Sequence, residues 1–231
     1  MANLAALFAR YDRLVLFDTE TTGLNYSRDE IIEFAAVVVE QVDGTPKIVR
    51  EYDELVALAP GSFVPPKIEE LTGISTQDLR ERGLPKTRVC RDIGELFQGN
   101  TLLLAYNAHF DLSFLFYMLL RDGDPTILKG KDKLDLLTVY RDRRSYPHKL
   151  CSAIEAYGLT GRVVNSHRAV DDVIATFAVM EEMEKEKADL ERYVNLFGYI
   201  PKYGVEGKPI GSVTYKPQPF DPAAPLYEAA T

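Results

Sequence analysis

The chain has 231 residues, of which 46% are hydrophobic and 27% are charged, the balance of an ordinary soluble domain with a sizeable core. No apolar run approaches the roughly 20 residues needed to cross a bilayer, and charges come too early for a signal peptide, so we expect a cytoplasmic protein with no membrane association. Taken alone, the net charge of −8 argues weakly against tight binding of nucleic acid, because proteins that bind its phosphates are usually basic over the contact face.

The first part of the chain has the pattern of strands. Residues 14–17 form an apolar run that ends at Asp18, and residues 31–40 form a second run rich in β-branched residues. A Thr-Thr-Gly turn lies between the two runs, and residues 48–58 alternate imperfectly, as a third strand would. This order predicts an antiparallel meander of three strands.

Helices and two further strands alternate over the middle of the chain. Short helices are predicted at residues 66–71, 75–82 and 87–97. A fourth strand is predicted at residues 101–105 and a short fifth one at 133–137, with a helix running on from it. Further helical patterns cover residues 111–121, 148–157 and 166–195. The whole order predicts an α/β fold, a mixed five-stranded sheet flanked by helices.

The last part of the chain differs in composition. Ten of the 34 residues from 198 to 231 are Gly or Pro, which is typical of a linker or a disordered tail. Four tyrosines and Phe220 in the same stretch indicate that parts of it pack onto something. We expect a principal domain at 1–197 and a Pro/Gly/Tyr-rich C-terminal extension at 198–231.

Two acids follow the first apolar run directly. Residues two apart on a strand point to the same face, so Asp18 and Glu20 present two carboxylates side by side. An isolated pair of this kind is most often only a polar strand end. Here the pair precedes the Thr-Thr-Gly turn, and two like charges this close need a cation.

A third acid, Asp111, lies where the loop after the fourth strand passes into a helix. Capping that helix is one interpretation of its position. Strand ends are also where α/β proteins bind ligands, so Asp111 would lie beside Asp18 if the first and fourth strands are neighbours.

The long helical segment carries a fourth acid on its apolar side. Asp172 falls within a stripe formed by Ala169, Val173, Thr176 and Met180, whereas the adjacent Asp171 projects to the opposite side. An unpaired carboxylate on a core-facing stripe is costly, so Asp172 must meet a cation or a buried donor. His167, in the first turn, lies near the same region, although a lone histidine more often has a structural role.

Four carboxylates from separate segments, converging at one end of a sheet, form an all-oxygen ligand set that suits Mg²⁺ or Mn²⁺ and does not suit zinc. Two such ions about 4 Å apart are the known arrangement for hydrolysing a phosphodiester. A nearby histidine is a suitable general base for the attacking water.

Three motifs occur in the order and spacing of the DEDDh family of 3′–5′ exonucleases. They are Phe-Asp-Thr-Glu-Thr-Thr-Gly at 17–23, Asn-Ala-His-Phe-Asp at 107–111 and His-Arg-Ala-Val-Asp-Asp at 167–172. The resemblance covers roughly residues 13–187 and is greatest to the proofreading exonucleases of bacterial DNA polymerase III. It implies an RNase H-like fold, two bound Mg²⁺ or Mn²⁺ ions, and release of nucleoside 5′-monophosphates from the 3′ end of DNA, in proofreading or repair.

The resemblance also implies roles for individual residues. The acids Asp18, Glu20, Asp111 and Asp172 match the metal ligands, and His167 matches the general base. The family's substrate-binding positions correspond to Thr19, Thr21, Leu24, Asn107 and His167, with Leu24 as an apolar wedge against the last base. One departure is Tyr106, which stands where many relatives have a histidine.

Two other functions remain open at this point. An RNA 3′ exonuclease, of the oligoribonuclease or RNA-trimming type, uses the same five residues, and a non-catalytic scaffold would bind nucleic acid or a polymerase in the same cleft. A DNA polymerase, or another replication or repair protein, is the expected protein partner. A basic stretch is predicted to follow the substrate strand through Arg141, Arg143, Arg144 and Lys149.

Overall fold

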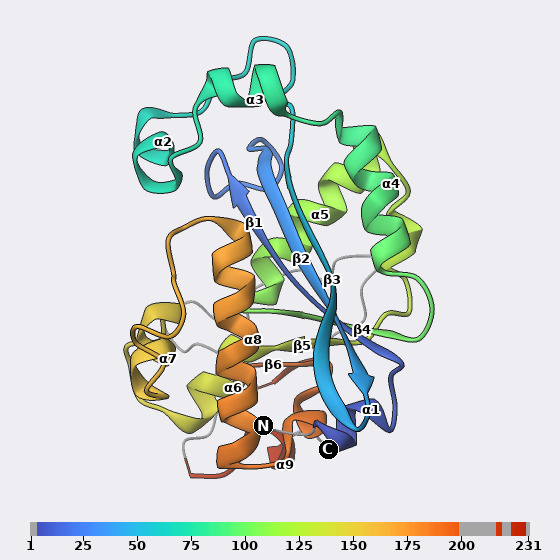
Figure 1. Cartoon of the computed structure of the whole chain (residues 1–231), viewed down its shortest axis with the longest axis vertical. Coiled ribbons are helices and arrows are strands. Elements are labelled where there is room, and N and C mark those ends of the chain that lie inside the picture. The colour runs from blue at the N-terminus through green and yellow to red at the C-terminus, as the bar shows by residue number, and fades with distance from the viewer. Residues whose placement is uncertain (1–3, 199–215, 219–222, 230–231) are drawn as a thin grey trace.

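The computed structural model of the protein describes residues 4–198, 216–218 and 223–229, and it contains one mixed five-stranded sheet (Figure 1). The strand order is β3-β2-β1-β4-β5; the first three strands are antiparallel, and β4 and β5 run parallel to β1. The predicted α/β sheet with its three-strand meander is therefore confirmed. The strands are β1 (Arg13–Thr21), β2 (Ile31–Val42), β3 (Thr45–Leu55), β4 (Thr101–Ala105) and β5 (Lys133–Asp135).

Helices cover both faces of this sheet (Figure 1). One face carries α4 (Lys86–Leu96) and α5 (Ala108–Asp122), and the other carries α6 (Leu136–Arg143), α7 (Leu150–Ala156) and α8 (Ala169–Glu186). Side chains alternate along β1: Leu14 and Leu16 pack in the core on the α8 side, whereas Val15 and Phe17 pack on the α5 side. Both faces of β1 are thus buried, as its apolar run predicted.

Local signals start and stop the short helices. Pro66 is the first residue of α2 (Pro66–Thr72), which ends at Gly73 with φ of 70°. Ser75 and Asp78 form a capping box that starts α3 (Thr76–Arg82). Both helices were predicted, whereas the N-terminal α1 (Ala5–Phe8) and the 3₁₀ turn η1 (Pro125–Leu128) were not.

The longest helix is shorter than its sequence pattern predicted. α8 ends at Glu186 rather than near residue 195, and the 3₁₀ turn η2 (Leu190–Tyr193) follows it. The buried Arg143 stabilises this end, because its guanidinium donates to the carbonyl oxygens of Met183 (2.6 Å) and Lys187 (3.2 Å). Periodicity alone did not reveal this C-terminal cap.

The role predicted for Arg143 on the substrate strand is therefore wrong. Its side chain is only 6% exposed and pairs with Asp189 at 2.5 Å, so it holds α6 to the end of α8. The neighbouring Arg144 pairs with Glu186 at 2.5 Å. Only Arg141 and Lys149 stay candidates for a contact with the substrate.

Part of the C-terminal extension packs against the domain. β6 (Leu196–Gly198) pairs with β7 (Lys216–Gln218), and α9 (Leu226–Ala229) buries Leu226, whose N–H donates to Asp142 at 2.9 Å. The Tyr227 hydroxyl donates to Asp189 at 2.8 Å. Packing of the extension is thus confirmed at Tyr227, whereas its other aromatic residues, Tyr199, Tyr203, Tyr215 and Phe220, lie outside the described residues. None of the helices described is long and apolar enough to span a membrane.

Candidate active site

The end of β1 supplies the first two acids of the site. Alternation along β1 puts Asp18 and Glu20 on the same face as Leu14 and Leu16, which is the face that α8 covers. The Glu20 carboxylate lies within 4.8 Å of a ligand atom of Asp172. The predicted pair therefore faces the helix that carries the fourth acid.

Asp111 reaches the site from the other face of the sheet. Its Oδ1 accepts hydrogen bonds from the backbone N–H of Thr19 (3.0 Å) and from the Thr19 hydroxyl (2.7 Å). Asn107, with φ of 73°, occupies the N-cap position, and α5 begins three residues before Asp111. The capping interpretation of Asp111 is therefore wrong, and the contact with Thr19 fixes it beside Asp18.

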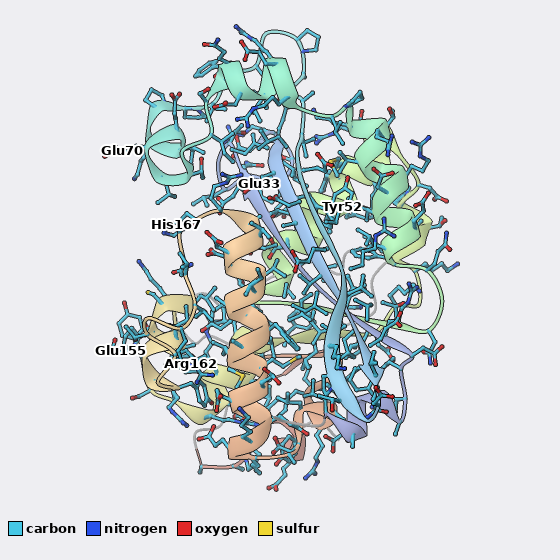
Figure 2. All side chains as sticks on the ribbon, viewed as in Figure 1. Glu33, Tyr52, Glu70, Glu155, Arg162 and His167 are labelled. Carbon is cyan, nitrogen blue, oxygen red and sulfur yellow. The ribbon has the colours of Figure 1, made fainter. Side chains whose placement is uncertain are left out.

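Asp172 and His167 lie at the start of α8. Asp172 is 8% exposed, and its Oδ1 accepts a hydrogen bond from the Asn165 side chain at 2.6 Å. His167 is exposed and precedes the helix, in a left-handed conformation with φ of 58°, rather than lying in the first turn as predicted (Figure 2). Ligand atoms of Glu20, His167 and Asp172 all lie within 4.8 Å of one another.

The four carboxylates resist ionising together. Burial, followed by the charges of Asp111, Glu20 and Asp172, raises the pKa of Asp18 well above its usual value. Burial and then the charge of Asp172 raise the pKa of Glu20 to about 8. Burial also raises the pKa of Asp172, and it raises that of Asp111 to about 7 although the hydrogen bonds from Thr19 oppose it. A cluster of this kind is stable in its ionised form only when cations neutralise it.

A buried ion pair holds the start of α8 against the sheet. Glu33 on β2 lies directly across from Glu20 on β1 and is fully buried. Its carboxylate pairs with the guanidinium of Arg168, with Nε at 2.8 Å, and accepts the backbone N–H of Ala169 at 2.7 Å. Glu33 therefore fixes the backbone between His167 and the helix that carries Asp172.

Sequence reasoning missed Glu33, although a signal was present. It interrupts an otherwise apolar, β-branched run on a central strand, where an unpaired carboxylate would be costly. Asp135, the last residue of β5, was missed as well. Its carboxylate accepts hydrogen bonds from the backbone N–H groups of Asn107 (2.9 Å) and Ala108 (3.1 Å). Asp135 thus holds the loop that leads to Asp111.

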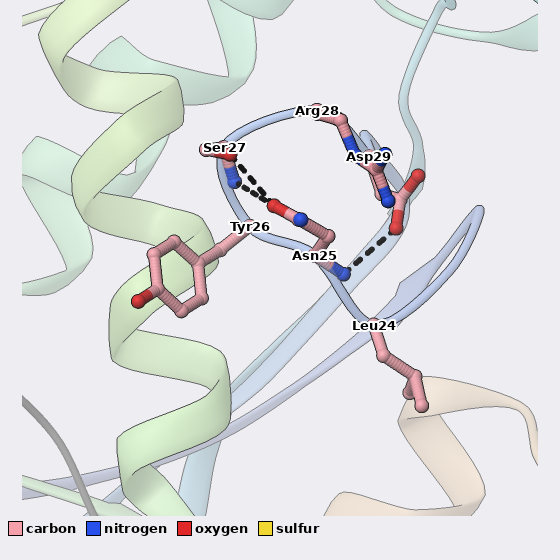
Figure 3. Close-up of a pocket in the computed structure, with 6 residues that line it drawn as sticks. All are labelled: Leu24, Asn25, Tyr26, Ser27, Arg28 and Asp29. Carbon is pink, nitrogen blue, oxygen red and sulfur yellow. Dashed lines mark hydrogen bonds between the residues drawn. The ribbon is translucent and has the colours of Figure 1, made fainter.

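The residues expected to bind substrate differ in their exposure to solvent. Thr19 is buried against Asp111, and the buried Thr21 hydroxyl donates to the carbonyl of Gly23 at 2.6 Å. Leu24 is 84% exposed and points toward the start of α8 (Figure 3). Asn107 is also exposed. The open pocket that Leu24–Asp29 line belongs to this loop rather than to the four carboxylates.

Comparison with known proteins finds DNA polymerase III proteins and a 3′-5′ exonuclease among the relatives of this chain. The PolC-type DNA polymerase III of Clostridium perfringens is 34% identical over 182 residues, which cover 78% of this chain and 12% of the polymerase. The 3′-5′ exonuclease DinG of Bacillus subtilis is 34% identical over 179 residues, 75% of this chain and 18% of that protein. The DNA polymerase III subunit epsilon of Treponema pallidum is 31% identical over 160 residues, 68% of this chain and 69% of the subunit.

The fold is that of solved exonuclease structures. The crystal structure of E. coli Exonuclease I in complex with a dT13 oligonucleotide matches 79% of this chain and 43% of that one, with a TM-score of 0.68 and 23% identity. This chain thus has the fold of part of Exonuclease I. It spans only a small part of the length of PolC and DinG. Residues 15–180 match the Exonuclease family (RNase_T), and the chain belongs to that family.

Proposed function

We propose that this chain hydrolyses phosphodiesters at the 3′ end of DNA, single-stranded or frayed, and releases nucleoside 5′-monophosphates. The observation that carries the proposal is the group of four carboxylates on β1, α5 and α8, whose pKa values are all raised, with His167 beside it. Acids that burial and mutual repulsion keep from ionising together form a natural site for divalent cations.

Exonucleases of this family are metal-dependent, and the donor set here fits Mg²⁺ or Mn²⁺. Four carboxylates supply only oxygen ligands, which both ions prefer, and Asp18, Glu20, Asp111 and Asp172 would hold two of them. Bound there, the ions would supply Lewis-acid stabilisation of charge at the scissile phosphate.

The side chains of the chain itself divide the remaining tasks. His167 accepts the proton of the attacking water as general base, and Thr19 orients Asp111 through two hydrogen bonds. The exposed Leu24 lies against the terminal base, Thr21 supports the terminal nucleotide from the end of β1, and Asn107 supports it from the start of α5. All of these groups except Leu24, which directly follows the first motif, come from motifs shared with the family.

DNA is the substrate that the relatives' names favour, because two of those described are DNA polymerase III proteins. A DNA polymerase is by the same reasoning the proposed partner, and proofreading or repair the proposed process. We assign the nuclease to a domain at 1–197 and treat 198–231 as an added extension, part of which packs on α6 and η2.

A nuclease assay tests the proposal directly. Single-stranded DNA and RNA of one sequence, labelled at the 3′ end, are incubated with the protein in Mg²⁺ or in EDTA. We expect Mg²⁺-dependent release of labelled mononucleotide from DNA, and a loss of about 10³-fold in Asp18→Ala. Asp12→Ala, an exposed acid just before the other end of β1, is the matched control. Digestion in EDTA, or digestion by Asp18→Ala at the normal rate, would contradict the mechanism. Faster digestion of RNA than of DNA would show that RNA is the preferred substrate.

Glu33→Gln is predicted to lower kcat about 10-fold with little change in KM, the usual effect of losing a group that orients a functional side chain. The substitution removes the charge that pairs with Arg168 and loosens the segment that carries His167. Steady-state kinetics measure the effect. Asp189→Asn is the matched control, because it removes an ion pair at the other end of α8.

A double-mutant cycle separates positioning of His167 from a general loss of structure. If Glu33 acts through His167, adding Glu33→Gln to His167→Ala costs little further activity. Independent, multiplying losses in the double variant would contradict this role. Arg168→Lys keeps the positive charge but lacks the planar pair of donors, so we expect it to keep only part of the wild-type kcat.

A further inference from the structure

The loop between β1 and β2 is attached to α5 through a stacked pair of tyrosines. The rings of Tyr26 and Tyr117 lie 5.2 Å apart with an interplanar angle of 26°, and Tyr26 meets the edge of Phe114 at 6.5 Å. Figure 3 shows the Tyr26 ring lying along α5, on the opposite side of the loop from Leu24. Yet Tyr26 remains 40% exposed and Tyr117 is only partly buried. The stack therefore leaves aromatic surface open to solvent.

These rings continue a row that starts at the candidate site. Phe110, next to Asp111, lies 4.9 Å from Phe114, and the row passes on through Tyr26 to Tyr117. The ring of Phe116 meets that of Tyr117 edge-on, with the centroids 5.5 Å apart. The row thus runs along α5 from the carboxylates toward the far end of the helix.

A basic residue lies at the far end of the row. Arg121 follows Tyr117 by four residues, so it lies one turn further on the same face of α5. It is exposed, and within the described part of the chain it forms no ion pair with an acid. On a chain with a net charge of −8, an unneutralised arginine beside exposed aromatic rings is complementary to a phosphate backbone with unstacked bases.

We propose that Tyr26, Tyr117 and Arg121 form a subsite for the upstream nucleotides of the single strand whose 3′ end occupies the carboxylate site. The two rings stack with bases, which needs no particular sequence, and Arg121 contacts a phosphate. The subsite rests on the proposed nuclease function and extends it: the enzyme grips a strand several nucleotides long, rather than its terminal nucleotide alone.

Comparing a long and a short substrate tests the subsite. The long substrate is a single-stranded DNA 10-mer, about the length that such rows bind. The short one is the p-nitrophenyl ester of thymidine 5′-monophosphate, which has no upstream nucleotide. In Tyr26→Ala and in Tyr117→Ala we expect KM for the 10-mer to rise about 5- to 100-fold with kcat nearly unchanged. We expect both constants to stay normal for the ester, and Tyr26→Phe, which keeps the ring, to resemble the wild type.

Arg121→Glu tests the phosphate contact separately. It should raise KM for the 10-mer at low salt and reduce the slope of log KM against log salt by about 1. Lys67→Glu, an exposed lysine on α2, is the matched control.

Each other outcome overturns the subsite. Equal loss on both substrates would mean that the tyrosines only hold the Leu24 loop in place. Unchanged KM for the 10-mer in both alanine variants would exclude stacking with upstream bases, and normal melting temperatures would show that the variants are folded. If the wild type hydrolyses neither substrate in Mg²⁺, the nuclease function itself fails; if it hydrolyses both and the variants match it, only the subsite fails.

Discussion

Replacing Glu20 by glutamine is expected to lower kcat by about 10³-fold and to raise the melting temperature of the metal-free protein. Glutamine keeps the shape of the side chain but removes a metal ligand and one like charge. Burial and then the charge of Asp172 raise the pKa of Glu20 to about 8, so its ionised form is unfavourable in the folded, metal-free site. The same charge that costs stability without the metal provides the metal's binding site.

The pH dependence of this stability has a definite sign. Because the pKa of Glu20 is about 8 in the folded protein and 4.5 ordinarily, the folded state binds the proton more tightly. The stability contributed by that proton is fully present below pH 4.5 and is lost as pH rises through about 8. In EDTA, Glu20→Gln and the wild type should therefore melt together near pH 5, and the variant should melt higher by a few degrees near pH 8.5.

Thermal melting with and without Mg²⁺ measures both halves of this prediction. Mg²⁺ should raise the melting temperature of the wild type at pH 8.5, because the ion binds only the folded state, and should raise that of the variant much less. Glu155→Gln, an exposed glutamate on α7, controls for the loss of charge alone (Figure 2). A variant that melts lower than the wild type in EDTA at pH 8.5 would show that Glu20 is already neutralised by the protein.

Most of the fold follows from local patterns in the sequence. The apolar run before Asp18 and the β-branched run after residue 30 predict strands because such short, continuous apolar runs are typical of strands buried on both faces of a sheet, and the extent of β4 is predicted without error. Helix ends are predicted less well, because they depend on distant partners. α8 stops at Glu186, where Arg143 from another helix binds its last carbonyl oxygens.

The candidate site shows the same division. Strand alternation and the apolar stripe of α8 place Asp18, Glu20 and Asp172 on facing surfaces, and the structure brings Glu20 and Asp172 together. Periodicity could not predict that Thr19 on the opposite face of β1 would bind Asp111, or that Glu33 would hold the segment before α8. These contacts join residues 92 and 136 positions apart, and only the packed sheet makes them neighbours.

The error at Arg143 has a physical cause as well. A run of basic residues in sequence indicates positive charge but not whether acids neutralise it. Here Asp189 and Glu186 come from the segment around the end of α8 and bind Arg143 and Arg144. By contrast Arg121, which does not stand out in the sequence, is exposed one helical turn from Tyr117 on α5. Charge that is available to a substrate is therefore a property of the fold.

His167→Ala is expected to lower kcat by about 10²- to 10⁴-fold, the range typical of losing a general acid or base. Two roles are open to this side chain, because its ring lies within 4.8 Å of ligand atoms of both Glu20 and Asp172. As general base it accepts a proton from water, and its loss leaves the four carboxylates intact. As a metal ligand it would contribute to the affinity for the ions.

Measuring kcat and metal affinity on the same variant decides between these roles. If His167 is the base, the Mg²⁺-induced rise in melting temperature and the Mg²⁺ concentration for half-maximal activity stay near normal, and added imidazole restores part of the rate. His148→Ala is the matched control: that ring contacts Tyr140 and Tyr146 and bonds a backbone carbonyl outside the cluster, so kcat should be normal. A fall in Mg²⁺ affinity parallel to the fall in kcat would assign His167 to the metal instead. The exposed position of His167 favours the role of base, because the ring can take a proton from the attacking water and then release that proton to solvent.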